Sequence, residues 1–104
     1  MSLRSIKLSE NCLVDLDLGV ILRCGHPYAI SRMEARTLEK LYNHTGSVVS
    51  TEQLLFHLWR TTEIEKNCLY VIINRLRLKL ETNPKLPQYL ITIRKKGYLL
   101  RTTK

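Results

Sequence analysis

Hydrophobic residues between positions 67 and 81 recur with the spacing of an α-helix. Leucine and isoleucine fall on one stripe that can pack against a core, at Leu69, Ile72, Ile73, Leu76 and Leu80. The opposite face carries amide, phenol, guanidinium and methyl groups, from Asn67, Tyr70, Val71, Asn74, Arg75 and Leu78, with Arg77 and Lys79 on its flanks. The pattern predicts a helix over about residues 65–81 with one buried face and one face whose chemistry suits base edges and phosphates.

Two earlier segments also have helical spacing, and each begins with a capping box. Ser31 precedes Glu34 by three residues, and Ser50 precedes Gln53 by three, so each hydroxyl can accept from a backbone amide while the second side chain reaches back. Apolar residues then share one face, at Ala35, Leu38, Leu41 and Tyr42 and at Leu54, Leu55, Leu58 and Trp59. This predicts helices at about 31–44 and 51–59, with Gly46 in the turn between them.

The two ends of the chain have the pattern of strands. Short apolar segments separated by turn residues predict a four-stranded antiparallel sheet at about 6–30. One face of that sheet should be wet, because Val14 and Leu16 alternate with Leu13 and Asp15. After residue 81 two prolines end the helix. Two apolar runs around Lys95-Lys96-Gly97 then predict a hairpin at about 89–101, with a glycine turn and two lysines at its tip.

The order of these elements predicts an α+β fold, a single winged helix-turn-helix domain over residues 1–104. It consists of the N-terminal four-stranded antiparallel sheet, three helices and a C-terminal β-hairpin wing. The major groove of B-DNA, about 12 Å wide, admits one helix. A hairpin beside that helix can reach the adjacent backbone or minor groove, whose negative potential attracts basic residues. The plan therefore favours double-stranded DNA as the partner.

Charge supports a polyanionic partner. The chain has 17 Lys and Arg against 9 Asp and Glu, a formal net charge of +8, which favours nucleic acid over a membrane surface. Its three cysteines, Cys12, Cys24 and Cys68, show no paired spacing, so a reducing compartment is expected. No apolar run is long enough to span a bilayer, and residues 1–7 are too polar for a signal peptide. We therefore expect a cytoplasmic domain.

The residues give no sign of catalysis or of a bound cofactor. Cys24 and His26 offer two metal ligands in one turn, but no second pair completes a site. The chain has no glycine-rich phosphate loop and no nucleophile elbow, so we expect no metal, no cofactor, no small-molecule substrate and no enzymatic activity. His44 and His57 are expected on helix surfaces, and Trp59 and Tyr98 in the core.

The run from Leu54 to Leu100 resembles the effector domain of OmpR/PhoB-type bacterial transcriptional regulators. The most specific matches are Leu76-Arg77 within NRLRLKLE and Ile91–Arg94 followed by Gly97-Tyr98. The segment before the wing and the lysine-rich tip are closest to the ToxR/CadC-like branch, in which the domain is N-terminal and a membrane anchor follows. A receiver domain, an anchor in the inner membrane and no further segment stay open as alternatives beyond residue 104, and the resemblance to this branch favours the anchor. The resemblance also implies two further partners: RNA polymerase and a second copy of the domain on repeated half-sites.

The resemblance also implies roles for single residues. It places the helix at residues 67–81 in the major groove, where Arg75 contacts a base or phosphate and Arg77 clamps a phosphate. Thr92 and Arg94 would contact the backbone from the base of the wing. The chain departs from response regulators at Tyr70 and Ile72, where acidic and histidine residues are frequent, and at Lys95, where glycine is common. Ile72 is better explained as core.

The residues implied by the resemblance, together with the polar and apolar residues of the outer helix face and the lysines of the wing tip, make up the expected DNA-binding set. Asn74 can make paired hydrogen bonds to adenine, as arginine does to guanine. The set is Asn67, Tyr70, Val71, Asn74, Arg75, Arg77, Leu78, Thr92, Arg94, Lys95 and Lys96. Two other functions stay open: a winged-helix protein–protein adaptor that docks through Tyr70, Val71 and Leu78, and binding of any polyanion through net charge alone.

Overall fold

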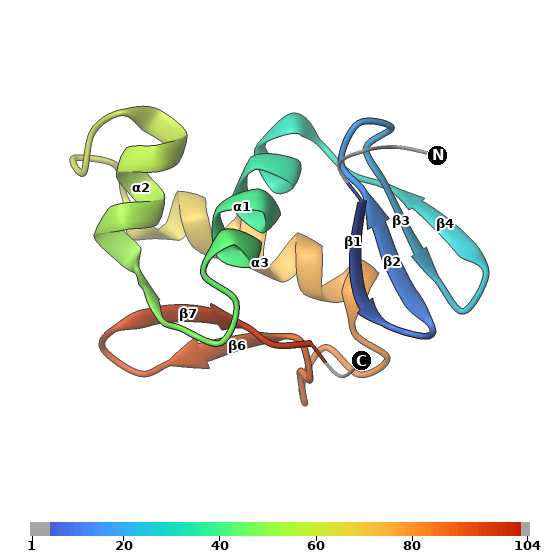
Figure 1. The fold of residues 1–104 in the computed structure, drawn as a ribbon. Coiled ribbons are helices and arrows are strands. Elements are labelled where there is room, and N and C mark those ends of the chain that lie inside the picture. Colours follow the sequence, from blue (N-terminus) through green and yellow to red (C-terminus); the bar gives the residue numbers. More distant parts are fainter. Residues whose placement is uncertain (1–4, 103–104) are drawn as a thin grey trace.

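The computed structural model describes residues 5–102, which form two sheets and three helices (Figure 1). Strands β1 (Ser5–Ser9), β2 (Cys12–Asp15), β3 (Val20–Arg23) and β4 (His26–Ala29) make an antiparallel sheet in chain order. Helices α1 (Arg32–Asn43), α2 (Thr51–Trp59) and α3 (Lys66–Leu80) follow. The second sheet contains β5 (Val49–Ser50), β6 (Leu90–Ile93) and β7 (Gly97–Leu100). The predicted winged-helix class is confirmed, and every helix begins and ends within one residue of its predicted range.

The wing has a third strand that the sequence pattern does not predict. Strand β5 pairs antiparallel with β7, with Val49 opposite Tyr98 and Ser50 opposite Gly97, so the sheet has the order β5-β7-β6. Two residues are too few to show a hydrophobic period. Because β5 leads directly into α2, this pairing attaches the wing to the first helix of the helix-turn-helix.

The predicted glycine turn is wrong, and the glycine serves a different purpose. The hairpin turn consists of residues 94–96, and Lys95 takes the left-handed conformation with φ of 65°. Gly97 instead starts β7, where an added Cβ would lie 2.1 Å from the carbonyl oxygen of Val49. Glycine is therefore needed for the close approach of β7 to β5. Gly46, by contrast, has φ of 82° in the turn after α1, as expected.

Both predicted capping boxes are present. The Ser31 hydroxyl accepts from the amide of Glu34 at 3.1 Å, and the Ser50 hydroxyl accepts from the amide of Gln53 at the same distance. Helix α3 has no side-chain cap at its N-terminus, where Glu65 is the N-cap residue. Burial of its apolar stripe therefore stabilises this helix without a cap.

A single core joins the helices to both sheets. The apolar stripe of α3 is fully used, since Leu69, Ile73, Leu76 and Leu80 are at most 1% exposed and Ile72 is 8% exposed. Burying each such side chain contributes about 1.5–3 kcal/mol. Figure 1 shows α3 crossing behind α1, above the wing and beside the N-terminal sheet. Trp59 and Tyr98 pack on this core while remaining partly exposed.

Charged side chains fix the C-terminal end of α3 against its neighbours. Lys79 forms a salt bridge of 2.7 Å with Glu34 of α1, whose carboxylate also caps that helix. Arg23 of β3 donates to the backbone oxygen of Glu81 and to the hydroxyl of Tyr28, and its guanidinium lies 4.9 Å from the centre of the Tyr28 ring. The orientation of α3 is therefore set from both α1 and the N-terminal sheet.

His57 was predicted on a helix surface, and this prediction is wrong. His44 is exposed at the end of α1, but His57 is half-buried, and its Nε2 atom has no hydrogen-bond partner among residues 5–102. Burial lowers the pKa of His57 below its usual value, and the nearby Arg36 and Lys40 lower it further. The helical pattern placed His57 on the surface because it does not show that Arg36 folds over the end of α2, donating to the His57 carbonyl at 2.6 Å.

Candidate nucleic-acid interface

The outer face of α3 reaches solvent along its length. Tyr70, Val71 and Leu78 are among the exposed large side chains of the molecule. Asn67 and Arg75 are also exposed, whereas Asn74 and Arg77 are half-buried. This is the face opposite the buried stripe, so the helical pattern separated the two faces correctly. Amide and guanidinium donors thus stand beside apolar groups, a mixture that can contact base edges and thymine methyl groups.

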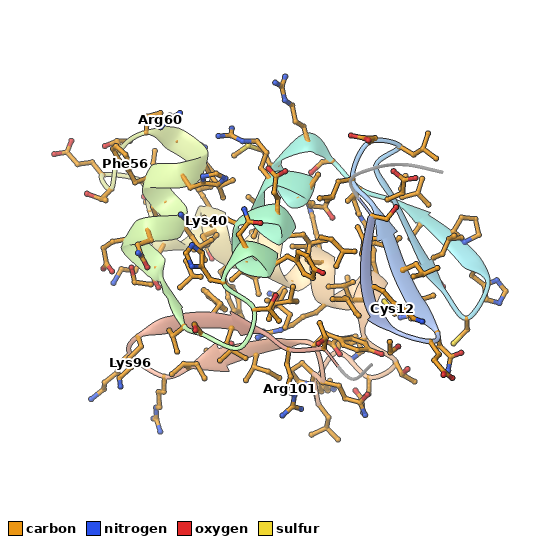
Figure 2. The ribbon with its side chains drawn as sticks, in the orientation of Figure 1. Cys12, Lys40, Phe56, Arg60, Lys96 and Arg101 are labelled. Atoms are coloured by element: carbon orange, nitrogen blue, oxygen red, sulfur yellow. The ribbon has the colours of Figure 1, made fainter. Side chains whose placement is uncertain are left out.

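The wing presents a second group of donors. Thr92, Arg94, Lys95 and Lys96 are all exposed, on β6 and in the turn that follows it. Figure 2 shows Lys96 extending outward from the tip of the wing, away from the core. Lys95 adopts a left-handed backbone conformation, which costs a lysine some energy. Lys95 and Lys96 together place two adjacent ammonium groups at the tip of the wing.

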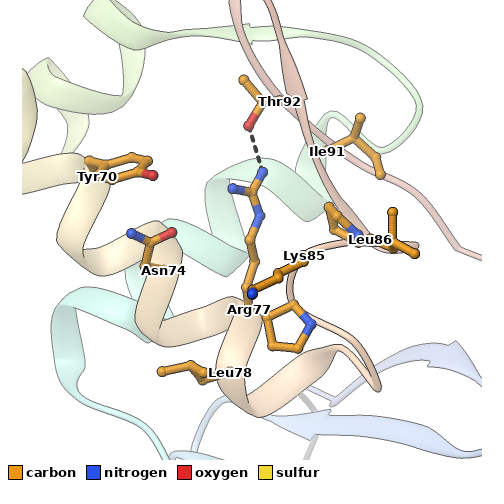
Figure 3. A pocket seen from close by; sticks show the side chains of 10 residues that line it. Tyr70, Asn74, Arg77, Leu78, Lys85, Leu86, Ile91 and Thr92 are labelled. Atoms are coloured by element: carbon orange, nitrogen blue, oxygen red, sulfur yellow. Dashed lines mark hydrogen bonds between the residues drawn. The ribbon is translucent and has the colours of Figure 1, made fainter.

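Arg77 joins these two groups. Its Nε donates to the carbonyl oxygen of Leu90 at 3.0 Å, and its Nη2 donates to the hydroxyl of Thr92 at 2.6 Å (Figure 3). Two predicted site residues are therefore in direct contact, one from the helix and one from the wing. A guanidinium has five N–H groups, so three remain for another partner. The arrangement fixes the wing relative to α3.

An open groove of about 830 Å³ runs beside this contact, and we call it the α3–β6 groove. One wall is the outer face of α3, with Tyr70, Asn74, Arg77 and Leu78, and the others are residues 84–87 and Ile91 and Thr92 of β6. A smaller groove of about 210 Å³ lies between the start of α2, the start of α3 and the wing tip, and Lys66, Lys95 and Lys96 line it.

The lining residues that were not predicted as site residues include Lys66, Lys85 and Leu86. Lys66 directly precedes Asn67 and lies in the first turn of α3, inside the predicted helix, but it was not included among the residues expected to contact DNA. Lys85 and Leu86 lie in the Pro-Lys-Leu-Pro loop, whose sequence indicates only that the helix stops. No short-range pattern shows that this loop folds back beside α3.

Within residues 5–102, no three His, Cys, Asp or Glu side chains lie close enough together to hold a metal ion. Burial raises the pKa of the hydroxyl of Tyr98 on β7, although the charge of Arg77 opposes the shift, so this hydroxyl stays protonated. No helix in the described part of the chain is long and apolar enough to cross a membrane.

Known proteins are similar to this chain in sequence and in fold. A family model described as the C-terminal part of transcriptional regulatory proteins matches residues 25–100. The probable transcriptional regulator ycf27 of Cyanophora paradoxa is 33% identical over an alignment of 93 residues, and the match covers 86% of this chain and 39% of that protein. The chain thus spans about two fifths of the length of this relative.

Solved structures agree. The DNA-binding domain of Klebsiella pneumoniae RstA, in complex with the RstA box, has a TM-score of 0.79 and 28% identity, covering 94% of this chain and 97% of that one. The DNA-binding domain of Escherichia coli CadC has a TM-score of 0.74 and 25% identity, covering 89% of this chain and 88% of that one. The expected resemblance is confirmed, and CadC is itself among the matches. The chain therefore belongs to the family of transcriptional regulatory protein C-terminal domains, which are of the OmpR/PhoB type.

Proposed function

We propose that this domain binds double-stranded DNA sequence-specifically as part of a transcriptional regulator, with α3 in the major groove and the wing on the adjacent backbone or minor groove. The observation that carries the proposal is the exposed donor face of α3, braced through Arg77 to a lysine-tipped wing. Membership of the family supports it, and so does the DNA complex formed by the similar RstA domain.

The exposed residues divide by chemistry into readers and anchors. Arg75 and Asn74 can each make paired hydrogen bonds to a base, and Val71 and Leu78 offer apolar contacts to thymine methyl groups. Arg94, Lys95 and Lys96 hold phosphates, which positions the protein without reading sequence. Roughly five phosphate contacts, from these three and the flanks of α3, predict that log K falls with log salt at a slope of about −4 to −5.

The partners follow from the size of the interface. One α3 helix offers few base contacts, so we infer that two copies bind repeated half-sites. The linker of residues 60–63 or the N-terminal sheet would then touch the neighbouring copy or RNA polymerase. We place this domain in the cytoplasm with the DNA, and we assign it no enzymatic activity, cofactor or small-molecule substrate.

A gel-shift series tests the proposal. Promoter fragments and random duplex are compared at two salt concentrations. We expect salt-steep binding to both kinds of DNA, with a higher affinity for at least one promoter fragment. Equal affinity for any polyanion would instead indicate binding through net charge alone and would overturn the proposal.

The exposed apolar residues on α3 favour one alternative, a protein–protein adaptor that docks through Tyr70, Val71 and Leu78. An adaptor would show no salt-steep DNA binding, and Val71→Asp would abolish binding of its protein partner. The DNA-binding proposal expects Val71→Asp to weaken DNA binding, because the new carboxylate would face the bases and phosphates of the major groove.

A further inference from the structure

The proposed function uses the walls of the α3–β6 groove that α3 and β6 form, but it gives no role to the remaining wall. That wall is the loop of residues 84–87, which contributes Lys85 and Leu86. Figure 3 shows the Lys85 side chain extending from this loop toward α3, on the side where Arg77 lies. The groove therefore places a cation on each of two facing walls.

Its charge selects an anion. None of the residues that line the groove is Asp or Glu, and Lys85 makes no salt bridge within the described part of the chain. Two like charges that face each other without a carboxylate repel, and an anion between them removes the repulsion. Tyr70, Asn74 and Thr92 line the same groove and add hydroxyl and amide groups.

The loop is held in place before any ligand arrives. The carboxylate of Glu81, only 1% exposed, accepts from the backbone amides of Gln88 at 2.7 Å and Leu90 at 2.8 Å. The Asn83 side chain accepts from the amide of Lys85 at 3.0 Å, and prolines on both sides fix the backbone. A rigid wall lowers the entropy that binding would cost.

The rims of the groove are apolar. Leu86 is 73% exposed on the loop and Leu78 is 63% exposed on α3, so neither contributes much to the core. The groove thus combines cations and hydroxyl groups with exposed carbon surface. A sugar–phosphate chain has the same composition, because charged phosphates alternate with largely apolar deoxyribose rings.

We propose that the α3–β6 groove takes the backbone of one DNA strand, with a phosphate between Arg77 and Lys85 and a deoxyribose against Leu86. The inference rests on the proposed function and adds the loop of residues 84–87 to the interface. Tyr70 and Asn74 belong both to this groove and to the outer face of α3. A strand that borders the major groove around α3 therefore passes directly into it.

The first test compares Lys85→Gln with Lys7→Gln on random-sequence duplex. Lys7 is an exposed lysine on β1, on the outer face of the N-terminal sheet, so it matches the charge change away from the groove. Loss of one phosphate contact should reduce the salt slope of Lys85→Gln by about 0.9. Lys7→Gln should keep the slope of the unsubstituted domain.

The second test locates the phosphate. Single phosphates of the duplex are replaced by uncharged methylphosphonates, one position at a time. For the unsubstituted domain we expect affinity to fall at several positions; for Lys85→Gln we expect no further fall at one of these. Equal losses for both proteins at every position would show that Lys85 contacts no phosphate and would overturn the inference.

Leu86→Glu gives an independent variant that keeps the fold, because this side chain is mostly exposed. A carboxylate on the rim should weaken binding to any duplex by about tenfold or more, since it repels the phosphate. If the domain binds duplex and both loop variants behave like Lys7→Gln, the groove assignment is wrong and the proposed function stands. If the unsubstituted domain binds no duplex and an acidic peptide fills the groove instead, both proposals are wrong.

Discussion

Arg77 serves the fold and the candidate site with the same guanidinium. Two of its N–H groups bond Leu90 and Thr92, which fixes the distance between α3 and β6. Arg77 also lines the α3–β6 groove, so a phosphate bound there could accept from its remaining N–H groups. A lysine at this position would supply the charge but could not hold both strand contacts in one plane.

At the residue scale, readers and anchors should separate in mutant binding. Arg75→Ala should cost about 1–3 kcal/mol on the preferred sequence and little on random duplex, which relaxes specificity. Lys96→Ala should weaken both by a similar factor and reduce the salt slope by about one. Gel shifts on both duplexes measure this difference. Equal losses on both duplexes for both variants would contradict the division.

Gly97→Ala tests the close approach of β7 to β5. The new methyl group would meet the Val49 carbonyl at 2.1 Å, so the strands must separate. We expect a loss of about 1–3 kcal/mol or more in the free energy of unfolding, measured by urea titration. Gly25→Asn is the control, because nothing lies within 4 Å of a Cβ there and asparagine tolerates its positive φ. An unchanged stability for Gly97→Ala would show that β5 does not hold the wing.

His57 should make stability depend on pH. Its pKa is lowered in the folded state, chiefly by burial and further by Arg36 and Lys40, so the unfolded chain takes up the proton first as pH falls. The free energy of unfolding should therefore decrease from about pH 7.5 to 5.5. His57→Gln should remove part of this decrease, whereas His44→Gln at the exposed end of α1 should keep all of it. An identical pH dependence in His57→Gln would contradict this account of the buried imidazole.

At the element scale, the connection between α3 and β6 depends on one buried carboxylate. Glu81 follows the last residue of α3, and its oxygens accept from the amides of Gln88, Tyr89 and Leu90. These bonds bring the start of β6 back beside the helix. The hydroxyl of Tyr89 also bonds Ser9 of β1 at 2.7 Å, which ties the same segment to the N-terminal sheet.

Removal of the Glu81 carboxylate should loosen the wing. Glu81→Ala should cost about 3 kcal/mol or more, since each buried amide without an acceptor costs about 1–3 kcal/mol. Urea unfolding measures the loss, and Glu63→Ala, at an exposed position in the α2–α3 linker, should be nearly neutral. A small effect of Glu81→Ala would mean that water can replace the carboxylate and that the loop is not rigid.

The elements that can be predicted well from the sequence are those with a repeating pattern or a local cap. The apolar stripe of α3 repeats along a helix of fifteen residues, and each capping box involves only two residues that are three positions apart. Strand β5, the close approach at Gly97 and the buried Glu81 depend on residues distant in the chain. The same limit applies to the candidate site. The sequence pattern predicted the outer face of α3 and the wing tip. It could not predict that Lys85 lines the groove, because that depends on how the loop folds back beside α3.

At the scale of the whole molecule, the polar faces of two separate elements share one side of a single core. Helix α3 is held by the salt bridge from α1 and by Arg23 from the N-terminal sheet, while β5 and Arg77 hold the wing. The N-terminal sheet lies beside α3, opposite the wing tip (Figure 1). We therefore expect DNA to contact α3 and the wing in one event and to make no contact with the outer face of the sheet.

A titration of the ¹⁵N-labelled domain with a duplex that is enriched from a random library and trimmed to a single half-site, followed by NMR, tests this most directly. Backbone amides of α3 and of residues 90–97 should shift together and in proportion to bound duplex, while those of Leu13 and Leu22 on the outer face of the sheet stay in place. Largest shifts on the sheet, or no shifts in α3, would contradict the account.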